Sequence, residues 1–134
     1  MISAEHFNIL GSLIDNTFGK SSIRDAGYGV KVSLAGSSDS SGEMRPVMEL
    51  RFETIVNFNP RHGMTDQRKE LDKTSSKMIL AKLEEIKKEF RELAGKSLKC
   101  KELASPDASV IHISHNPSLV RARYCRPMSF EFHV

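Results

Sequence analysis

The segment NTFGKSS, residues 16–22, carries the Gly-Lys-Ser ending of a phosphate-binding loop. Such a loop needs Gly-x-x-x-x-Gly-Lys-Ser/Thr between a strand and a helix, because its glycines let successive backbone amides surround the phosphates. Here Ile14 stands at the position of the first glycine, and the preceding residues have the apolar spacing of a helix. We therefore predict no nucleotide site and interpret Gly19 as the end of a helix.

Four histidines, His62, His112, His115 and His133, raise the question of a metal site. Two of them lie three residues apart in the run HISH, which has the composition of a strand. Strand positions three apart point to opposite faces, so this pair cannot hold one ion without a bend. We expect polar strand residues here and no metal.

The remaining reactive side chains also have simple structural interpretations. Cys100 and Cys125 form no CxxC motif and are too few for a disulfide framework, which predicts buried free thiols in a reducing compartment. Four glutamates on a predicted helix are interleaved with lysines, as expected for surface ion pairs: Glu84, Glu85, Glu89 and Glu92. We predict that the protein is not an enzyme and uses no cofactor.

The basic run RARYCR, residues 121–126, places an aromatic side chain among arginines. That combination can meet a phosphate backbone. Strand alternation instead turns Tyr124 inward and leaves Arg121 and Arg123 on a polar face. The chain has 20 basic and 17 acidic side chains, an interspersed balance that permits nucleic-acid contact without implying it.

Composition indicates a globular chain of one domain, residues 1–134. Hydrophobic residues make up 39% and charged residues 28% of the 134 positions, near the averages of globular proteins. The first residues lack the basic region of a signal peptide, and no long uninterrupted apolar run follows. We expect no membrane segment and a location in the cytoplasm of the cell that makes the protein.

The N-terminal half reads as a helix followed by a hairpin. Ser3 can cap a helix that ends near Gly19, with apolar residues at helical spacing: Phe7, Leu10, Ile14 and Phe18. Alternating runs at 28–35 and 46–58 then predict two antiparallel strands. Between them the Ser/Gly-rich tip, residues 36–44, is expected to be mobile in an isolated subunit.

The C-terminal half reads as a long helix and three strands. The helix is predicted from Thr65 to Gly95, and its early part DKTSSK is so poor in apolar residues that we expect it to fray or project. Its apolar stripe consists of Ile79, Leu83, Ile86, Phe90 and Leu93. Strands follow in SLKCKEL, SVIHIS and VRARYCRPMSFEFHV, with a bulge or a sheet edge expected at Arg126 and Pro127.

This order, α-β-β-α-β-β-β, predicts an α+β fold with two layers. Because the clearest strands are amphipathic, both helices should cover one face of a mainly antiparallel sheet, with a mixed sheet as the alternative. The other face is polar and charged. That face and the open edges should meet water or neighbouring subunits.

This pattern resembles the tail-terminator and tail-completion proteins of long-tailed bacteriophages, which are small neck components of the virion. The likeness lies in the leading helix, the long hairpin ending in MELRFETIVNF, the single packed helix and the terminal strand ARYCRPMSFEF. It covers nearly the whole chain, and no diagnostic motif accompanies it.

The resemblance implies a structural protein that forms a ring, usually a hexamer, which caps the tail tube and joins it to the head. The implied partners are further copies of the chain, the tail tube, and sheath or head-connector proteins, while DNA only passes through the lumen. The expected assembly interface comprises Ser37, Ser38, Asp39, Ser40, Ser41, Glu43, Glu49, Arg51, Glu53, Arg121 and Arg123. The alternative is a small nucleic-acid-binding domain that uses the basic strand.

Overall fold

The computed structural model describes residues 1–19, 27–38, 40–59, 64–116 and 119–134. In these ranges the chain forms two helices and five strands in the predicted order. They are α1 (Ala4–Phe18), β1 (Tyr28–Ser38), β2 (Met44–Phe58), α3 (Met64–Ala94), β3 (Lys99–Leu103), β4 (Ser109–Asn116) and β5 (Leu119–His133). The predicted α+β class is confirmed.

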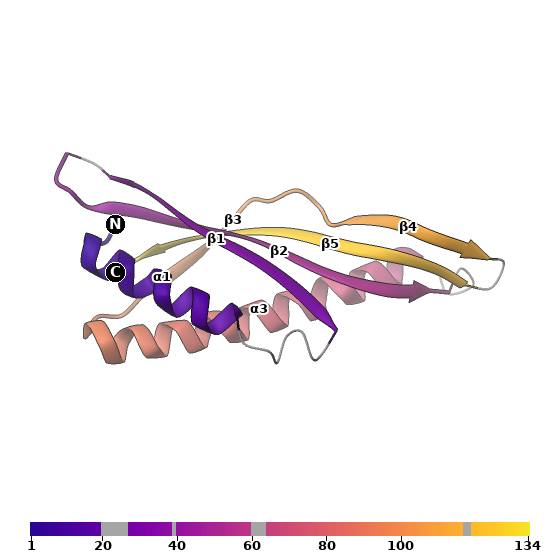
Figure 1. The fold of residues 1–134 in the computed structure, drawn as a ribbon, viewed down its shortest axis with the longest axis horizontal. Helices are drawn as coiled ribbons and strands as arrows, with labels where there is room; N and C mark the ends of the chain where they lie inside the picture. The colour runs from indigo at the N-terminus through magenta and orange to yellow at the C-terminus, as the bar shows by residue number, and fades with distance from the viewer. Residues whose placement is uncertain (20–26, 39, 60–63, 117–118) are drawn as a thin grey trace.

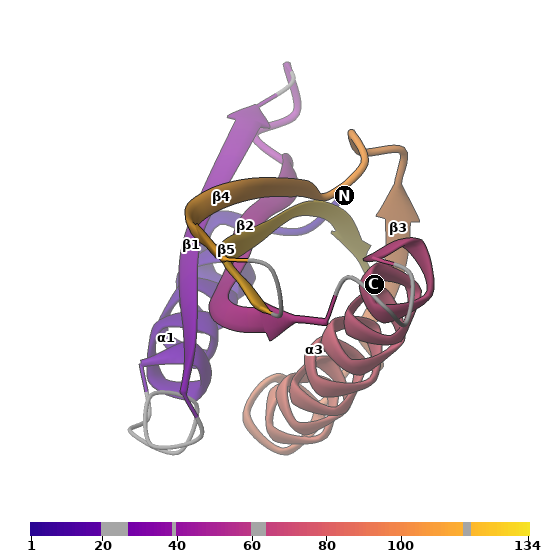
Figure 2. The ribbon, with the colours of Figure 1, turned by 90° about the vertical axis from the view of Figure 1, so that its right-hand side faces the viewer.

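The strands form one antiparallel sheet in the order β1-β2-β5-β3, and β4 also pairs with β5. No parallel pair occurs among the described strands, so the alternative of a mixed sheet is wrong. Both helices lie on the same face of the sheet (Figure 1), and the view along the strands shows α1 below β1 and α3 below the other side of the sheet (Figure 2). The fold therefore has the two predicted layers.

The first helix follows the predicted pattern. The hydroxyl of Ser3 accepts a hydrogen bond from the backbone N–H of His6 at 3.2 Å, which caps the first turn. Four of its apolar side chains are buried against the sheet and α3: Leu10, Leu13, Ile14 and Phe18. Gly19 ends the helix as expected, and its N–H donates to the carbonyl of Asp15 at 2.9 Å.

The hairpin is longer than predicted, and its tip is correspondingly shorter than residues 36–44. The ladder between β1 and β2 continues to the pair Ser38↔Met44, and Ile2 forms a further bridge with Met44. Gly36 lies against α1, where a Cβ atom would come within 2.6 Å of the ring of Phe7. A glycine that the sequence suggests as a flexible tip residue thus lets the helix pack closely on the strand.

The apolar stripe of α3 is confirmed except at its last member. Ile79, Leu83, Ile86 and Phe90 are buried, whereas Leu93 is 65% exposed. The next residue, Ala94, packs against the core instead. The prediction that Leu93 lies in the core is wrong. On the last turn of the helix, Ala94, four positions after Phe90, faces the core, and Leu93, three positions after it, does not.

The early part of α3 neither frays nor projects, so that prediction is also wrong. Arg126 of β5 lies on the core side of the sheet, and its Nη1 donates to the carbonyl of Asp72 at 2.6 Å, to Ser75 Oγ at 2.8 Å and to Ser76 Oγ at 2.6 Å. Tyr124 donates a short hydrogen bond to the carboxylate of Asp72. The polar residues of this turn are therefore contacts between the helix and the sheet.

Of the bulge or sheet edge predicted at Arg126 and Pro127, the bulge is absent, because β2 and β5 pair without a register shift from Val47↔Glu131 to Phe58↔Val120. The irregularity lies between β4 and β5, between His112 and Ser114. On that side of β5 the pairing with β3 ends at Ser129 and the pairing with β4 begins at Cys125. Pro127 thus falls at a local edge, where a residue without an N–H is tolerated.

The contact between Tyr124 and Asp72 predicts a stability change at high pH. Burial, together with the hydrogen bond to Asp72, raises the pKa of Tyr124 from 10.0 to about 12. Because the pKa in the folded state lies above that of the unfolded chain, this contribution is complete below pH 10 and is lost as the pH rises towards 12.

The difference in unfolding free energy between the parent and Tyr124→Phe should therefore shrink by about 2 kcal/mol over this range, as measured by urea denaturation. A difference that stays constant from pH 10 to 12 would contradict the assignment.

Candidate functional site

The Gly-Lys-Ser segment offers no support for a phosphate-binding loop. Residues 20–22 lie outside the described part of the chain. The element before them is α1 and not a strand, as the sequence predicts. The N-terminal half of the P-loop geometry, a strand that leads into the glycine turn, is therefore missing.

The histidines do not come together. His112 pairs with Ala122 on β5, whereas His133 lies at the far end of that strand, eleven residues or about 36 Å along it. His62 lies outside the described residues, and β4 includes His115 only as a backbone position. Among the described residues no three His, Cys, Asp or Glu side chains form a group that could hold a metal ion.

The cysteines are free thiols in different environments, and both are half-buried, so the prediction that they are buried is wrong. Cys100 pairs with the buried Phe132, and burial raises its pKa to about 11, which leaves little of the nucleophilic thiolate at neutral pH. Cys125 faces the other side of the sheet, with its Sγ 3.9 Å from the carboxylate of Glu53. Neither position favours covalent chemistry.

The glutamates of α3 behave as predicted where the structure records their contacts. Glu84 pairs with Lys87 at 3.1 Å, and Glu85 pairs with Lys82 at 3.6 Å. Both pairs span one helical turn at the surface, as the interleaved charges indicate. These side chains serve the helix and form no acid–base pair.

The strand residues of the predicted interface do share one surface, which we call the outward face, the side of the sheet away from α1 and α3. All five lie on it, between core residues that point the other way: Glu49, Arg51, Glu53, Arg121 and Arg123. Strand alternation was sufficient to place them together. Their role as an interface remains a prediction.

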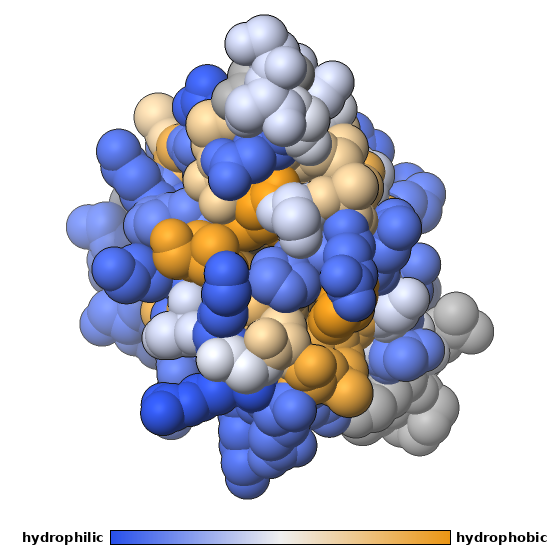
Figure 3. Space-filling model, turned by 90° about the vertical axis from the view of Figure 1, so that its left-hand side faces the viewer, coloured by the Kyte–Doolittle hydropathy of each residue, from blue (hydrophilic) through white to orange (hydrophobic). Residues whose placement is uncertain are grey.

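The serines of the tip lie at the opposite end of the sheet from the two predicted arginines. Ser37 and Ser38 belong to β1, Ser40, Ser41 and Glu43 belong to the turn, and Asp39 lies outside the described residues. Arg123 pairs with Ile55, ten residues or about 33 Å along β2 from Arg45 at the tip. Figure 3 views the molecule from the end where the tip lies and shows the pale tip projecting at the top. The predicted interface residues are thus spread over most of the length of the sheet, with Glu49, Arg51 and Glu53 between the tip and the two arginines.

The outward face is basic. The described strands place seven basic and three acidic side chains on it. The basic ones are Lys31, Arg45, Arg51, Lys99, Lys101, Arg121 and Arg123, and the acidic ones are Glu49, Glu53 and Glu131.

Most of the acidic groups on this face already have a cation beside them. Arg45 binds Glu131 with two hydrogen bonds, at 2.7 and 3.0 Å, and this bonding lowers the pKa of the Glu131 carboxyl. Arg51 lies 3.9 Å from Glu53. In the part of the chain that the structure describes, Lys31, Arg121 and Arg123 have no such partner.

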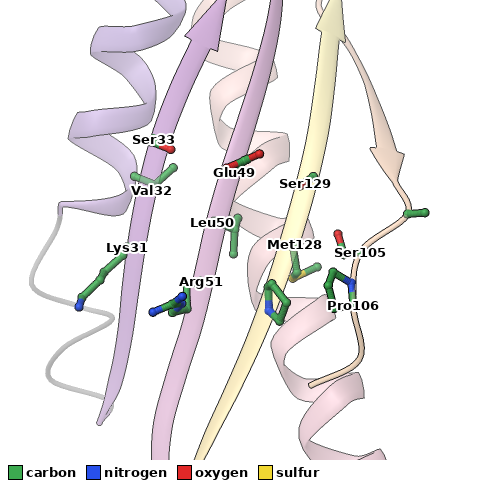
Figure 4. A pocket seen from close by; sticks show the side chains of 12 residues that line it. Lys31, Val32, Ser33, Glu49, Leu50, Arg51, Ser105, Pro106, Met128 and Ser129 are labelled. Carbon is green, nitrogen blue, oxygen red and sulfur yellow. The ribbon is translucent and has the colours of Figure 1, made fainter. Parts of the chain in front are cut away.

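A groove of about 420 Å³ crosses the middle of the outward face. The segment that connects β3 to β4 borders it with Ser105 and Pro106, and β1, β2 and β5 form its floor (Figure 4). Lys31 on β1 and Arg51 on β2 lie directly opposite each other there, which is an unfavourable arrangement of like charges. A carboxylate or phosphate group of a partner would relieve it.

Three exposed isoleucines that were not predicted from the sequence lie near the other end of this face. Ile55 is 49%, Ile111 59% and Ile113 51% exposed. The register places Ile55, Arg123 and Ile111 side by side on β2, β5 and β4, and we call these three residues the isoleucine–arginine row. Ile113 lies at the irregularity of β4. The signal was present, because Ile55 falls on the polar phase of an otherwise regular alternation.

The chain matches no protein-family model, no curated protein and no solved structure. None of the helices in the described ranges has the length and apolar character needed to cross a membrane. The outward face and the edges of the sheet are the surfaces from which a function can be inferred.

Proposed function

We propose that the protein is a structural component of a tailed bacteriophage, a tail-terminator or neck protein that assembles into a ring, caps the tail tube and joins it to the head. The proposal takes its class from the resemblance described above. It places the protein in the virion and, during assembly, in the host cytoplasm. The role requires contact surfaces for other proteins and no catalytic group.

The isoleucine–arginine row is the observation that carries the proposal. Two large aliphatic side chains in water flank an arginine without an ion-pair partner among the described residues. Apolar side chains combined with arginine are typical of the centre of a protein–protein interface. Exposed apolar side chains that are grouped among polar ones mark interaction sites.

The test is binding to purified tail tubes of the same phage. The double variant Ile55→Thr/Arg123→Gln keeps strand-forming or polar side chains but removes the apolar surface and the charge. We expect its co-sedimentation with tubes to fall at least tenfold, and tails assembled in its presence to lose their uniform length in electron micrographs.

Leu80→Gln is the matched control. Leu80 lies on α3 and is 49% exposed, the same fraction as Ile55, so the substitution removes an equally exposed aliphatic side chain from the opposite side of the molecule. It should leave tube binding unchanged. Equal binding by the double variant and the parent would refute the role of the row, and a parent that binds no tubes would refute the proposed function.

A second function, nucleic-acid binding, is favoured by one observation, the seven basic side chains against three acidic ones on the outward face. A phosphate binder should lose affinity for a labelled duplex by several orders of magnitude between about 50 and about 200 mM salt. Lys31→Gln/Arg121→Gln should reduce both the affinity and that salt dependence. A structural neck protein should bind the duplex weakly at either salt concentration.

A further inference from the structure

Two edges of the sheet remain unpaired among the described residues, β1 on one side and β3 with β4 on the other. We infer that β4 of one copy pairs with β1 of the next copy, so that the sheet continues from subunit to subunit. This inference rests on the proposed assembly role and names the contact that would close the ring. A contact between two different surfaces of the same chain repeats and can close a ring.

The strand directions suit this contact. Going from β1 through β2 and β5 to β4, every step is antiparallel, so β4 runs opposite to β1. A copy rotated about an axis along the strands therefore presents its β1 to β4 in the antiparallel sense. Residues 109–112, the part of β4 before its irregularity, contain no charged residue and no proline that would protect the edge.

Burial indicates that both edges are incomplete. The inward side chains of β1 are only half-buried, whereas those of the neighbouring β2, such as Leu50 and Phe52, are buried. Val110 on β4 is likewise half-buried although it packs against the core. Pairing of the two edges would cover Val30 and Val110 and extend one core into the next.

A groove at the edge of β1 offers room for the incoming strand. It has a volume of about 420 Å³ and lies between the end of α1 and the strand, with Phe18, Val30 and Val32 as its apolar lining. Among the described residues, its charged lining consists of Asp15, Glu53 and Lys31. This lining suits the apolar and weakly basic side chains of β4, Val110 and His112.

Charge disfavours pairing between two β4 edges. Such a contact would bring together Arg121 and Arg123 of both copies, which lie one strand inward. Contact between β4 and β1 instead places these arginines on the same face as Lys31 and Glu53 of the next copy, so it brings fewer like charges together.

Two blocked variants test the inference. An inward-pointing lysine on an edge strand is tolerated in water but opposes pairing, so Val30→Lys blocks β1 and Val110→Lys blocks β4. Sedimentation velocity should show each variant alone at the monomer mass of 15.0 kDa, while the parent forms larger closed assemblies. An equimolar mixture should form a species of twice 15.0 kDa, because one intact β4 and one intact β1 remain.

The other outcomes overturn the inference. Dimers of Val30→Lys alone would indicate pairing between two β4 edges, and a monomeric parent or a monomeric mixture of folded variants would show that the edges do not pair. Val47→Lys, on the interior strand β2, is the control and should assemble like the parent.

If either blocked variant fails to fold, as judged by circular dichroism, the substitutions Asp15→Lys and His112→Asp at exposed positions give the same mixing test.

These outcomes separate the inference from the proposed function. If the parent binds tubes and the blocked variants still form rings, the proposed function stands and this contact is rejected. A parent that neither associates nor binds tubes would reject both.

Discussion

Phe90→Ala should lower the free energy of unfolding by about 3–5 kcal/mol, the usual cost of removing a fully buried phenylalanine. Phe90 lies at the centre of the contact between α3, α1 and the sheet, and the ring of His6 packs edge-on against it with centroids 5.7 Å apart. The cavity left by the ring cannot collapse easily, because both helices and the sheet hold its walls. Urea denaturation monitored by circular dichroism measures the change.

Leu93→Ala is the control for this prediction, because it lies one turn further along the same helix. Leu93 is 65% exposed, so its truncation should change the free energy of unfolding by less than about 0.5 kcal/mol. The sequence pattern assigns both residues to one stripe, and the two substitutions therefore test the structure against the pattern. Similar losses at both positions would mean that the last turn of α3 is rotated towards the core.

Arg126→Met should cost about 2–4 kcal/mol, although it keeps most of the aliphatic length of the side chain. The substitution removes the donor shared by the carbonyl of Asp72 and the hydroxyls of Ser75 and Ser76. Ser75 is fully buried, so water cannot replace the lost partner without rearrangement. Hydrogen bonds from a charged group are also stronger than those between neutral groups.

Arg123→Met is the matched control on the same strand. Arg123 is exposed on the outward face, so its replacement should shift the free energy of unfolding by less than about 0.5 kcal/mol. A double-mutant cycle with Ser76→Ala should give a coupling of about 1 kcal/mol or more with Arg126 and none with Arg123. A cycle without coupling to Arg126 would show that the hydrogen bond between Arg126 and Ser76 does not stabilise the contact between the helix and the sheet.

The two arginines also explain why the basic run RARYCR is hard to interpret from its letters. Arg123 lies on the outward face and belongs to the isoleucine–arginine row, whereas Arg126 points inward and binds α3. Alternation predicts that their faces differ. It does not predict that an arginine on the core side finds acceptors in DKTSSK, because those partners lie about fifty residues away in the chain.

Local pattern was sufficient for the elements and for the faces of the strands. Helical spacing identified both helices, and period-two alternation placed Phe52 and Tyr124 in the core and Arg51 on the outward face. These features depend on the backbone geometry of each element alone, since a strand turns successive side chains to opposite sides wherever it lies. The order of elements and the α+β class followed from the same signals.

The tertiary structure decided every feature that depends on which segments meet. It shortened the hairpin tip because Gly36 and Met44 meet α1 and Ile2, and it left Leu93 in water because α3 ends its contact with the core at Ala94. It also separated the tip from the arginines and aligned Ile55 with Ile111. Strand order and register set these distances, and both result from packing between residues far apart in the sequence, which no local period encodes.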